Sequence, residues 1–466
     1  MRRSAAPILT GLLVTAGCVS VDPRQDLDAV SRDAESRGVG PVTLLSEDDA
    51  RHQVDDLLSR GITLDSAARI AILNNRRSRA AYESLGIARA DLARAGLLSN
   101  PVLDFSIRFR EAGADPVLDL GLTQRLTELF TLAARRDMAD TKLSLARTRA
   151  VDAALGAAFD ARLAVIEHAA AVARATTLHD LVDARRASYD FARALYDAGN
   201  ITDLTLSQHR AAYERSRLSL ARAELEAADS RERLNESLGL WGDQSRWQST
   251  QTLEPAPTPA ELPDDLEPRA VRASIAVESA RLELTHAAQR AGVAAPLILL
   301  DDTSAGVIAE RNEEGHWELG PSISVPIPIF DTGTAARSGA EAAMRREREL
   351  YADAAIRVRT AARRAAARFL AAQSEEAHWR EVLLPLSRNI LDQTLLEYNA
   401  MHASAFDLLN ARASLADAAA SRTEALAAYW SARIRLDAIL AGHLPTRAQD
   451  LPVLGALVDA PNTEGH

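Results

Sequence analysis

Apolar residues recur every seven positions in two stretches of the chain, 196–240 and 398–442, which lie 202 residues apart. A spacing of seven lines up side chains in one stripe along a helix, as in helices that pack in pairs. Each stretch has two such rows, and a single helix cannot bury them alone. The pattern therefore predicts a duplicated helical hairpin. The rows are Leu204, Ala211, Leu218 and Leu225; Leu206, Tyr213, Leu220, Ala227 and Leu234; Phe406, Ala413, Ala420, Ala427 and Ile434; and Leu408, Leu415, Tyr429 and Leu436, with Arg422 interrupting the last row.

A period of two replaces the helical period in three short stretches. Apolar and polar residues alternate at 103–110, 118–123 and 317–325, and an extended run ending near Ile308 precedes the third. Each strand formed this way has one apolar and one polar face. Such alternation fits a soluble sandwich, and it also fits an outer-membrane barrel whose apolar face meets lipid. The sequence predicts one strand hairpin in each half of the chain and leaves both settings open.

Proline and glycine divide the rest of the chain into segments. Long helices are expected at about 131–196 and 335–398, the second interrupted by Pro385, and shorter helices at 62–98 and 269–292. Gly199 is suited to a left-handed turn at the first hairpin tip. The expected segments are a polar tether at 18–60, a first repeat at 61–250, a proline-rich linker at 251–268, a second repeat at 269–443 and a loose tail at 444–466.

The start of the chain reads as a secretory leader. Arg2 and Arg3 precede a short apolar run, and small residues lead to Cys18, the single cysteine of the chain. We expect 1–17 to be a signal peptide and Cys18 to be a lipid-attachment site, although Thr15 stands where such signals usually have an aliphatic residue. A plain signal peptide is the alternative. The apolar run is too short to span a bilayer.

Composition and charge limit the function. Apolar residues make up 47% of the chain but aromatics only 4%, so alanine-rich, closely packed helices are favoured over a large aromatic core. The formal net charge of -11 disfavours nucleic acid as a partner. No phosphate-binding loop, nucleophile elbow or cluster with metal-ligand spacing occurs in the sequence. We therefore expect no catalytic residue, no cofactor and no metal site.

The number of strands makes a further point about assembly. The sequence predicts four strands, whereas bacterial transmembrane barrels begin at eight, and an open sheet edge cannot face lipid. If these strands span a membrane, several copies of the chain must close one barrel.

Four segments stand in an informative order. Ile62–Ala67 precedes Asn74-Asn75, Ala95–Pro101 opens the first strand, Tyr196–Leu204 forms the first tip, and Gly320–Gly333 ends in Pro-Ile-Phe-Asp-Thr-Gly. In this order they resemble the TolC-type outer-membrane efflux channels, over nearly all of 62–442. The resemblance implies a mainly α fold with a small β part. Duplicated helical hairpins would form an α-barrel tunnel, and four strands per chain would contribute to a 12-stranded trimeric outer-membrane β-barrel.

The resemblance also implies a function and partners. Such channels are passive exit ducts in tripartite efflux systems, and they dock through their hairpin tips onto a periplasmic adaptor and an inner-membrane pump. A lipidated Cys18 would place the chain in the lipoprotein branch of the family, which includes channels serving exporters of heavy-metal cations. The expected location is the outer membrane, with a lipid anchor and a large periplasmic part.

Individual positions receive expected roles from the same resemblance. Asp407 and Tyr398 match residues of the periplasmic gate, Asn410 stands where some members have a second acid, and Ala403 replaces an arginine of the closing network. The adaptor-docking residues at the two tips would be Gly199, Asn200, Met401 and His402. Apart from the family, Asp407 is a carboxylate at a helix N-terminus, where it stabilises the helix dipole. The alternative for the whole chain is a lipid-anchored periplasmic coiled-coil scaffold or spacer, which would not explain the strands.

Overall fold

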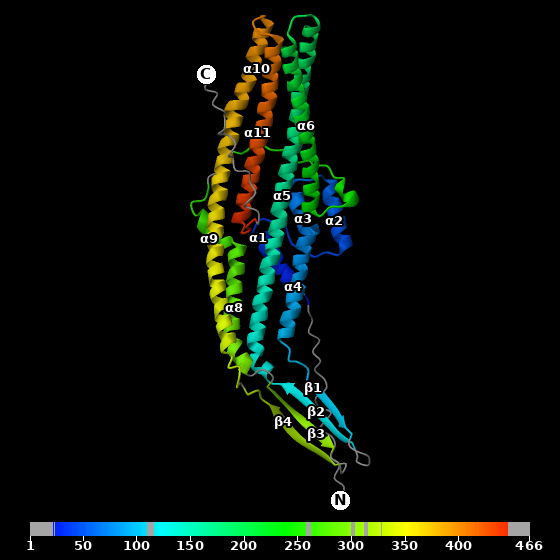
Figure 1. Cartoon of the computed structure of the whole chain (residues 1–466), viewed down its shortest axis with the longest axis vertical. Coiled ribbons are helices and arrows are strands. Elements are labelled where there is room, and N and C mark those ends of the chain that lie inside the picture. Colours follow the sequence, from blue (N-terminus) through cyan, green and yellow to red (C-terminus); the bar gives the residue numbers. More distant parts are fainter. Residues whose placement is uncertain are drawn as a thin grey trace. The chain divides into compact units, whose positions relative to one another are not determined.

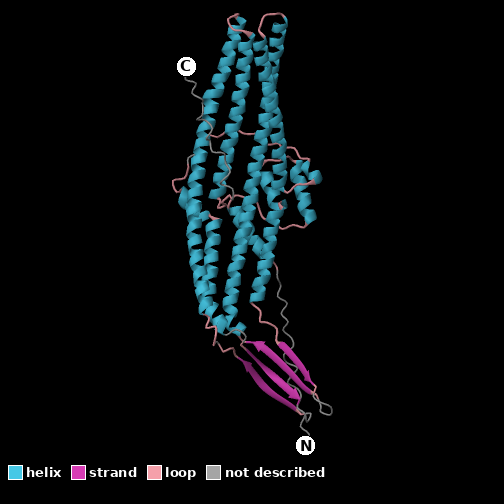
Figure 2. Ribbon diagram, in the orientation of Figure 1, coloured by secondary structure: helices cyan, strands magenta, loops and turns pink. Residues whose placement is uncertain are grey.

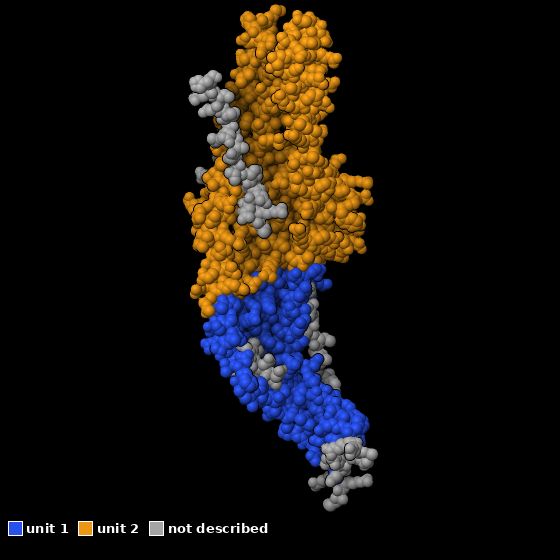
Figure 3. Space-filling view, viewed as in Figure 1, with its two compact units in different colours: residues 1–26, 83–146, 285–344 blue, residues 27–82, 147–284, 345–466 orange. Residues whose placement is uncertain are grey.

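The computed structural model describes residues 22, 24–109, 116–257, 262–299, 303–311, 316–327 and 329–445, and the side chains of these except 294–299. Cys18 and residues 446–466 of the expected tail lie outside the described residues. The chain divides into two compact units, which are coloured separately in Figure 3. Unit 1 comprises residues 1–26, 83–146 and 285–344, and unit 2 comprises 27–82, 147–284 and 345–466.

Two long helical hairpins form most of unit 2 (Figures 1 and 2). Hairpin 1 consists of α5 (Thr127–Asp197) and α6 (Asp203–Leu238). Hairpin 2 consists of α9 (Thr334–His378), a π-helical turn η2 (Trp379–Leu383), α10 (Leu384–Asn399) and α11 (Ala405–Leu440). The returning helices α6 and α11 each have 36 residues and begin 202 residues apart. The predicted duplication is therefore confirmed at the level of secondary structure.

A short helix followed by a longer one precedes each strand hairpin. These pairs are α3 (Leu64–Asn74) with α4 (Arg76–Ala95), and α7 (Leu266–Ala273) with α8 (Ile275–Leu299). The prediction of one helix at each place was wrong, because Asn75 and Ser274 both adopt an extended conformation and cap the helix that follows. The Asn75 side-chain oxygen accepts from the Arg77 and Ser78 amides, and the Ser274 hydroxyl accepts from the Val277 amide. The second helix also continues past the expected end at residue 292.

The segment predicted as a polar tether holds two helices, α1 (Arg24–Ser36) and α2 (Glu47–Ser59). This corrects the expectation for 24–59. The few apolar residues of the segment are spaced so that a helix buries them together: Val30 and Ala34 on α1, and Ala50 and Val54 on α2, are all fully buried. The segment is polar on average, and for that reason the sequence analysis did not recognise this spacing as helical.

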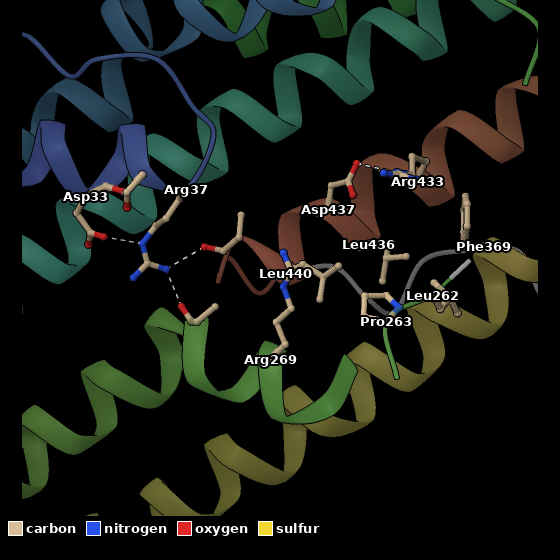
Figure 4. Close-up of a pocket in the computed structure, with 13 residues that line it drawn as sticks. Asp33, Arg37, Leu262, Pro263, Arg269, Phe369, Arg433, Leu436, Asp437 and Leu440 are labelled. Carbon is tan, nitrogen blue, oxygen red and sulfur yellow. Dashed lines mark hydrogen bonds and ion pairs between the residues drawn. The ribbon is translucent and has the colours of Figure 1, made fainter. Parts of the chain in front are cut away.

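Arg37, directly after α1, donates hydrogen bonds to carbonyls at the end of the second repeat. In the first repeat a residue of the repeat itself makes this kind of contact. Its Nη1 atom donates to the carbonyls of Ala273, at 2.6 Å, and Ala441, at 2.9 Å (Figure 4). In the first repeat the Asn74 side chain donates to the carbonyls of Leu238 and Gly239, and Gly239 is the counterpart of Ala441. A cavity of about 560 Å³ opens beside Arg37, lined in part by Phe369. The N-terminal helices thus belong to the folded body of unit 2.

Small side chains build the core of unit 2, as the composition predicts. One cluster joins α9, α11 and the linker residues before α7, with Phe369 and Tyr429 as its large members. A second joins α2, α3, α5 and α6 around Leu234, Leu238 and Trp247. Alanine accounts for much of both clusters, so the helices approach closely.

The four strands of unit 1 form one antiparallel sheet in the order β1-β2-β3-β4. They are β1 (Val102–Arg108), β2 (Val117–Arg125), β3 (Ser304–Arg311) and β4 (Trp317–Ser324). The register places Phe105 opposite Leu120, Leu120 opposite Ala309, and Ala309 opposite Leu319. These four residues therefore share one face, and the predicted strand hairpins are confirmed.

Candidate functional site

The two hairpin tips have the same backbone conformation and hydrogen-bond pattern. At the first tip the Gly199 amide donates to the Tyr196 carbonyl at 2.8 Å, and at the second the Met401 amide donates to the Tyr398 carbonyl at 2.9 Å. Gly199 and Met401 both lie in the left-handed region, with φ of 76° and 63°. The following bonds, from Asn200 to Leu195 and from His402 to Glu397, are both 2.8 Å. The repeat therefore extends to individual hydrogen bonds.

The expected docking residues differ in their side chains rather than in their turn geometry. Gly199, Asn200, Met401 and His402 are all exposed, and Met401 is 92% exposed. Met401 is the one non-glycine residue with positive φ among the described residues. A left-handed conformation costs a residue with a side chain about 1–2 kcal/mol, and such strain often marks functional positions. The second tip thus holds an exposed thioether on a strained turn.

Asp407 occupies the third position of α11, where it completes a capping box with Ser404. Its Oδ2 atom accepts from the Ser404 hydroxyl at 2.7 Å and from the Ser404 amide at 2.8 Å. These bonds hold the pKa of the exposed Asp407 carboxyl below its usual range. The carboxylate is therefore ionised at neutral pH and anchored to the tip, which is the helix-terminal role expected from the sequence without the family.

The other two candidate gate residues lie nearby but have separate contacts. Asn410 follows Asp407 by three positions on α11, and its Oδ1 atom accepts from Arg185 of α5 at 3.1 Å. Tyr398 lies in the last turn of α10, with its side chain 41% exposed. Within one chain, hydrogen bonds thus tie Asp407 to its own tip and Asn410 to hairpin 1, and none among the described residues joins Asp407, Asn410 and Tyr398 to one another.

An aromatic contact that the sequence analysis missed joins the two hairpins just behind the tips. Phe406 stacks on His209 of α6, with ring centroids 4.3 Å apart, and meets Phe191 of α5 at 5.1 Å. The His209 Nδ1 atom lies 3.0 Å from the Ser188 hydroxyl. Burial, with a smaller contribution from Arg185, lowers the pKa of His209, so the ring is neutral at neutral pH. Only the heptad position of Phe406 could have signalled this contact.

Among the described residues, no three His, Cys, Asp or Glu side chains are grouped as a metal site. None of the helices in the described part of the chain has the length and apolarity needed to cross a bilayer.

Comparison with known proteins supports the fold alone. No family model and no curated protein matches the sequence. Solved structures do match the fold. The outer membrane protein VceC of Vibrio cholerae matches with TM-score 0.64 and 16% identity, over 84% of this chain and 97% of that one. The open state of the Neisseria gonorrhoeae MtrE outer membrane channel gives TM-score 0.67, 17% identity, and coverage of 81% and 89%. The Campylobacter jejuni CmeC outer membrane channel gives TM-score 0.64, 15% identity, and coverage of 93% and 94%. This chain has the fold of outer-membrane channels.

Proposed function

We propose that this protein is the outer-membrane exit duct of a tripartite efflux system. In this proposal three copies close a barrel in the outer membrane and a helical tunnel in the periplasm. The observation that carries it is a sheet with one uncovered apolar face, attached to helical hairpins of a length that no compact core requires. The likeness to outer-membrane channels supports the same conclusion.

The uncovered face is defined by the strand register. Leu103, Phe105, Leu319 and Ile323, on the two edge strands, are each at least 60% exposed. The opposite face is polar, and there Arg108 lies 2.8 Å from the Asp119 carboxylate and 3.5 Å from that of Glu310. A contiguous apolar face of this kind marks contact with another protein or with lipid. In a membrane barrel, lipid would cover the apolar face and water in the lumen would solvate the ion pairs.

The repeat supports assembly from copies of the chain. On α11 the first heptad row packs against hairpin 1, where Phe406 meets His209 and Ala413 is buried among leucines of α5. On α6 the matching row lies open, because Leu204, Leu218 and Leu225 are 54–68% exposed. If equivalent helices make equivalent contacts, the α6 row packs against hairpin 2 of a second copy. Such a head-to-tail contact produces a closed ring when the rotation between neighbouring copies closes, as it would in the proposed trimer.

Hairpin 2 offers a matching surface for that contact. Leu386 on α10 is the counterpart of Ala184, which packs near Ala413, and Leu386 is half exposed. Ile390, one turn later, is also half exposed. Burying a leucine is worth about 1.5–3 kcal/mol, so a row of three on each copy would contribute substantially to a trimer. We propose a homotrimer on this basis and by the likeness to outer-membrane channels.

The tips take the gate and docking roles in the proposal. Three copies of Asp407 would form a ring of carboxylates near Tyr398 and Asn410, which would favour cations in the pore. The exposed Gly199, Asn200, Met401 and His402 would contact a periplasmic adaptor, which links the duct to an inner-membrane pump. Lipid on Cys18 would add an anchor in the outer membrane. The exported compounds would be small toxic molecules or heavy-metal cations selected by the pump. The duct itself catalyses no reaction.

Single-channel recording of the detergent-extracted protein, with its mass in solution, tests the proposal. We expect a trimer with discrete conductance steps. Asp407→Ala should increase leak or alter cation selectivity while the trimer persists. Asp407→Asn is the matched control for the helix cap, because its side-chain oxygen still accepts from Ser404 but the charge is gone.

Two results would count against these assignments. A monomer or dimer that never conducts would favour the anchored coiled-coil scaffold instead. Unchanged conductance and selectivity in both Asp407 variants would remove this residue from the gate. If the wild-type trimer is silent, a shut tip is the expected cause, and the Asp407 and Tyr398 variants should then conduct.

A further inference from the structure

Hairpin 2 is interrupted where hairpin 1 is continuous. In hairpin 2 the π-helical turn Trp379–Leu383 separates α9 from α10, and the Leu384 amide donates to the Trp379 carbonyl. Pro385 follows at once and has no amide hydrogen to give, so the regular bond to Glu381 cannot form. In α5 the position equivalent to Pro385 is Asp183, within a regular helix of 71 residues.

A buried polar group lies against this turn. Glu376, the last acid of α9, is 1% exposed. Its carboxylate is 3.3 Å from Arg380 and 3.9 Å from Arg422 of α11, yet neither of its oxygens accepts a hydrogen bond from a described residue. Within the described part of the chain, the Arg422 Nε atom and the Gln373 side-chain oxygen are likewise buried without a hydrogen bond. We call these four residues the polar seam.

The first repeat shows what two of these positions do without charge. The counterparts of Arg380 and Arg422 are Leu178 and Leu220, which belong to one apolar cluster formed by α5, α6 and α11. The counterpart of Glu376 is Arg174, which forms an ion pair with Glu424 of α11 at 3.0 Å. In hairpin 2, two arginines replace the two leucines and flank the buried Glu376, beside the one π-helical turn among the described residues.

We infer that the π-helical turn and the polar seam form a pivot, about which the tip half of hairpin 2 moves while hairpin 1 stays stiff. A π-helical turn breaks the regular hydrogen-bond ladder and is a place where a helix bends. The ion pairs of Glu376 lack hydrogen-bond geometry, so its carboxylate can shift between Arg380 and Arg422 as the helices move, whereas a packed leucine contact resists a small displacement.

The role of the pivot in gating rests on the proposed function. The tip half of hairpin 2 holds Tyr398, Met401 and Asp407, so motion about the pivot would displace the candidate gate. Arg380 also donates to the Ala256 carbonyl at 3.0 Å, which ties the base of the pivot to the linker between the repeats. The linker contact leaves the base of hairpin 2 fixed while its tip moves.

Amide hydrogen exchange on the full-length protein in detergent tests the pivot. We expect amides at 379–392 to exchange about tenfold faster than those at 177–190, because local opening is easier at the pivot. The triple variant Glu376→Leu/Arg380→Leu/Arg422→Leu should slow exchange at 379–392 by about tenfold, because apolar replacement of a buried ion cluster is often stabilising. Arg388→Leu, on the exposed side of α10, is the matched control and should change nothing.

A second variant guards against misfolding of the triple variant. Pro385→Asp introduces the residue of the first repeat and should also slow exchange at 379–392 without touching the seam. Equal exchange in the two hairpins of the wild type would overturn the pivot, and so would variants that fold but leave exchange unchanged. These exchange rates do not depend on conduction, so a pivot found in a protein that never conducts would refute only the channel.

Discussion

A substitution of Met401, the left-handed residue at the second tip, can separate the strain of the turn from the proposed role of its side chain in docking. In Met401→Gly, removal of the side chain relieves a conformational penalty of about 1–2 kcal/mol. Glycine also lowers the free energy of unfolding by about 0.4–1 kcal/mol, because it increases the conformational freedom of the unfolded chain. Because Met401 is 92% exposed, little packing is lost. The net effect is a more stable tip by roughly 0.5–1 kcal/mol, which corresponds to about a two- to fivefold change in local opening.

Amide exchange at the second tip measures this change. The amides of His402 and Ala403, which both donate to the Glu397 carbonyl, should exchange about two- to fivefold more slowly in Met401→Gly. Gly199→Ala is the mirror-image control, because alanine takes the left-handed conformation of the first tip and should speed exchange there by a similar factor. Under the proposed function, binding to a periplasmic adaptor should weaken in Met401→Gly, because the exposed thioether is removed, although the tip is more stable.

One result would refute the reasoning. If exchange at His402 and Ala403 is unchanged or faster in Met401→Gly, the turn carries no relievable strain, and the thioether must contribute contacts that its exposure does not reveal.

Three further predictions follow from single contacts. Leu218→Asp should shift the mass in solution from trimer toward monomer, because it places a charge in the open α6 row, while Ser219→Asp on another face of α6 should leave the trimer intact. The lowered pKa of His209 means that the unfolded chain takes up a proton first as pH falls below about 6.5, so the stability of the contact with Phe406 is present above that pH and declines below it. Protection of the amides near the tips, taken relative to their intrinsic exchange rates at each pH, should therefore fall on acidification in the wild type and not in His209→Gln. Gly239→Ala should lower the thermal midpoint, because a methyl group there would lie 2.9 Å from the Asn74 carbonyl oxygen on a left-handed backbone, whereas Gly86→Ala, at an open helical position, should not.

The sequence predicted the parts whose pattern is local. The heptad rows located both returning helices, the period of two located the strands, and Gly199 located a left-handed turn. Each of these signals is contained within a few turns of one element. Asn75 and Ser274 were missed because a residue that can cap a helix also occurs inside helices, and only packing decides.

Contacts between distant segments could not be predicted from these patterns. Arg422 was visible as an interruption of a heptad row, but its partner Glu376 lies on another helix and carries no local signal. The left-handed backbone at Met401 was equally hidden, because methionine there gives no sign of positive φ unless the first tip is laid over it. The helices at 24–59 depend on a few buried apolar residues in a polar segment.

The two repeats share a backbone fold and differ in their seams, and under the proposed function this difference would give the two hairpins different roles. Hairpin 1 has Leu178 and Leu220 on its seam and an unbroken α5, so in the proposed system it would keep its shape when an adaptor binds at Gly199 and Asn200. Hairpin 2 has a charged seam and a π-helical turn, and it holds Asp407 at its tip. Under the proposed function, a partner that binds the stiff tip has a fixed surface from which to displace the mobile one. Selection for opening would then act on Glu376, Arg380 and Arg422 as strongly as on the gate residues.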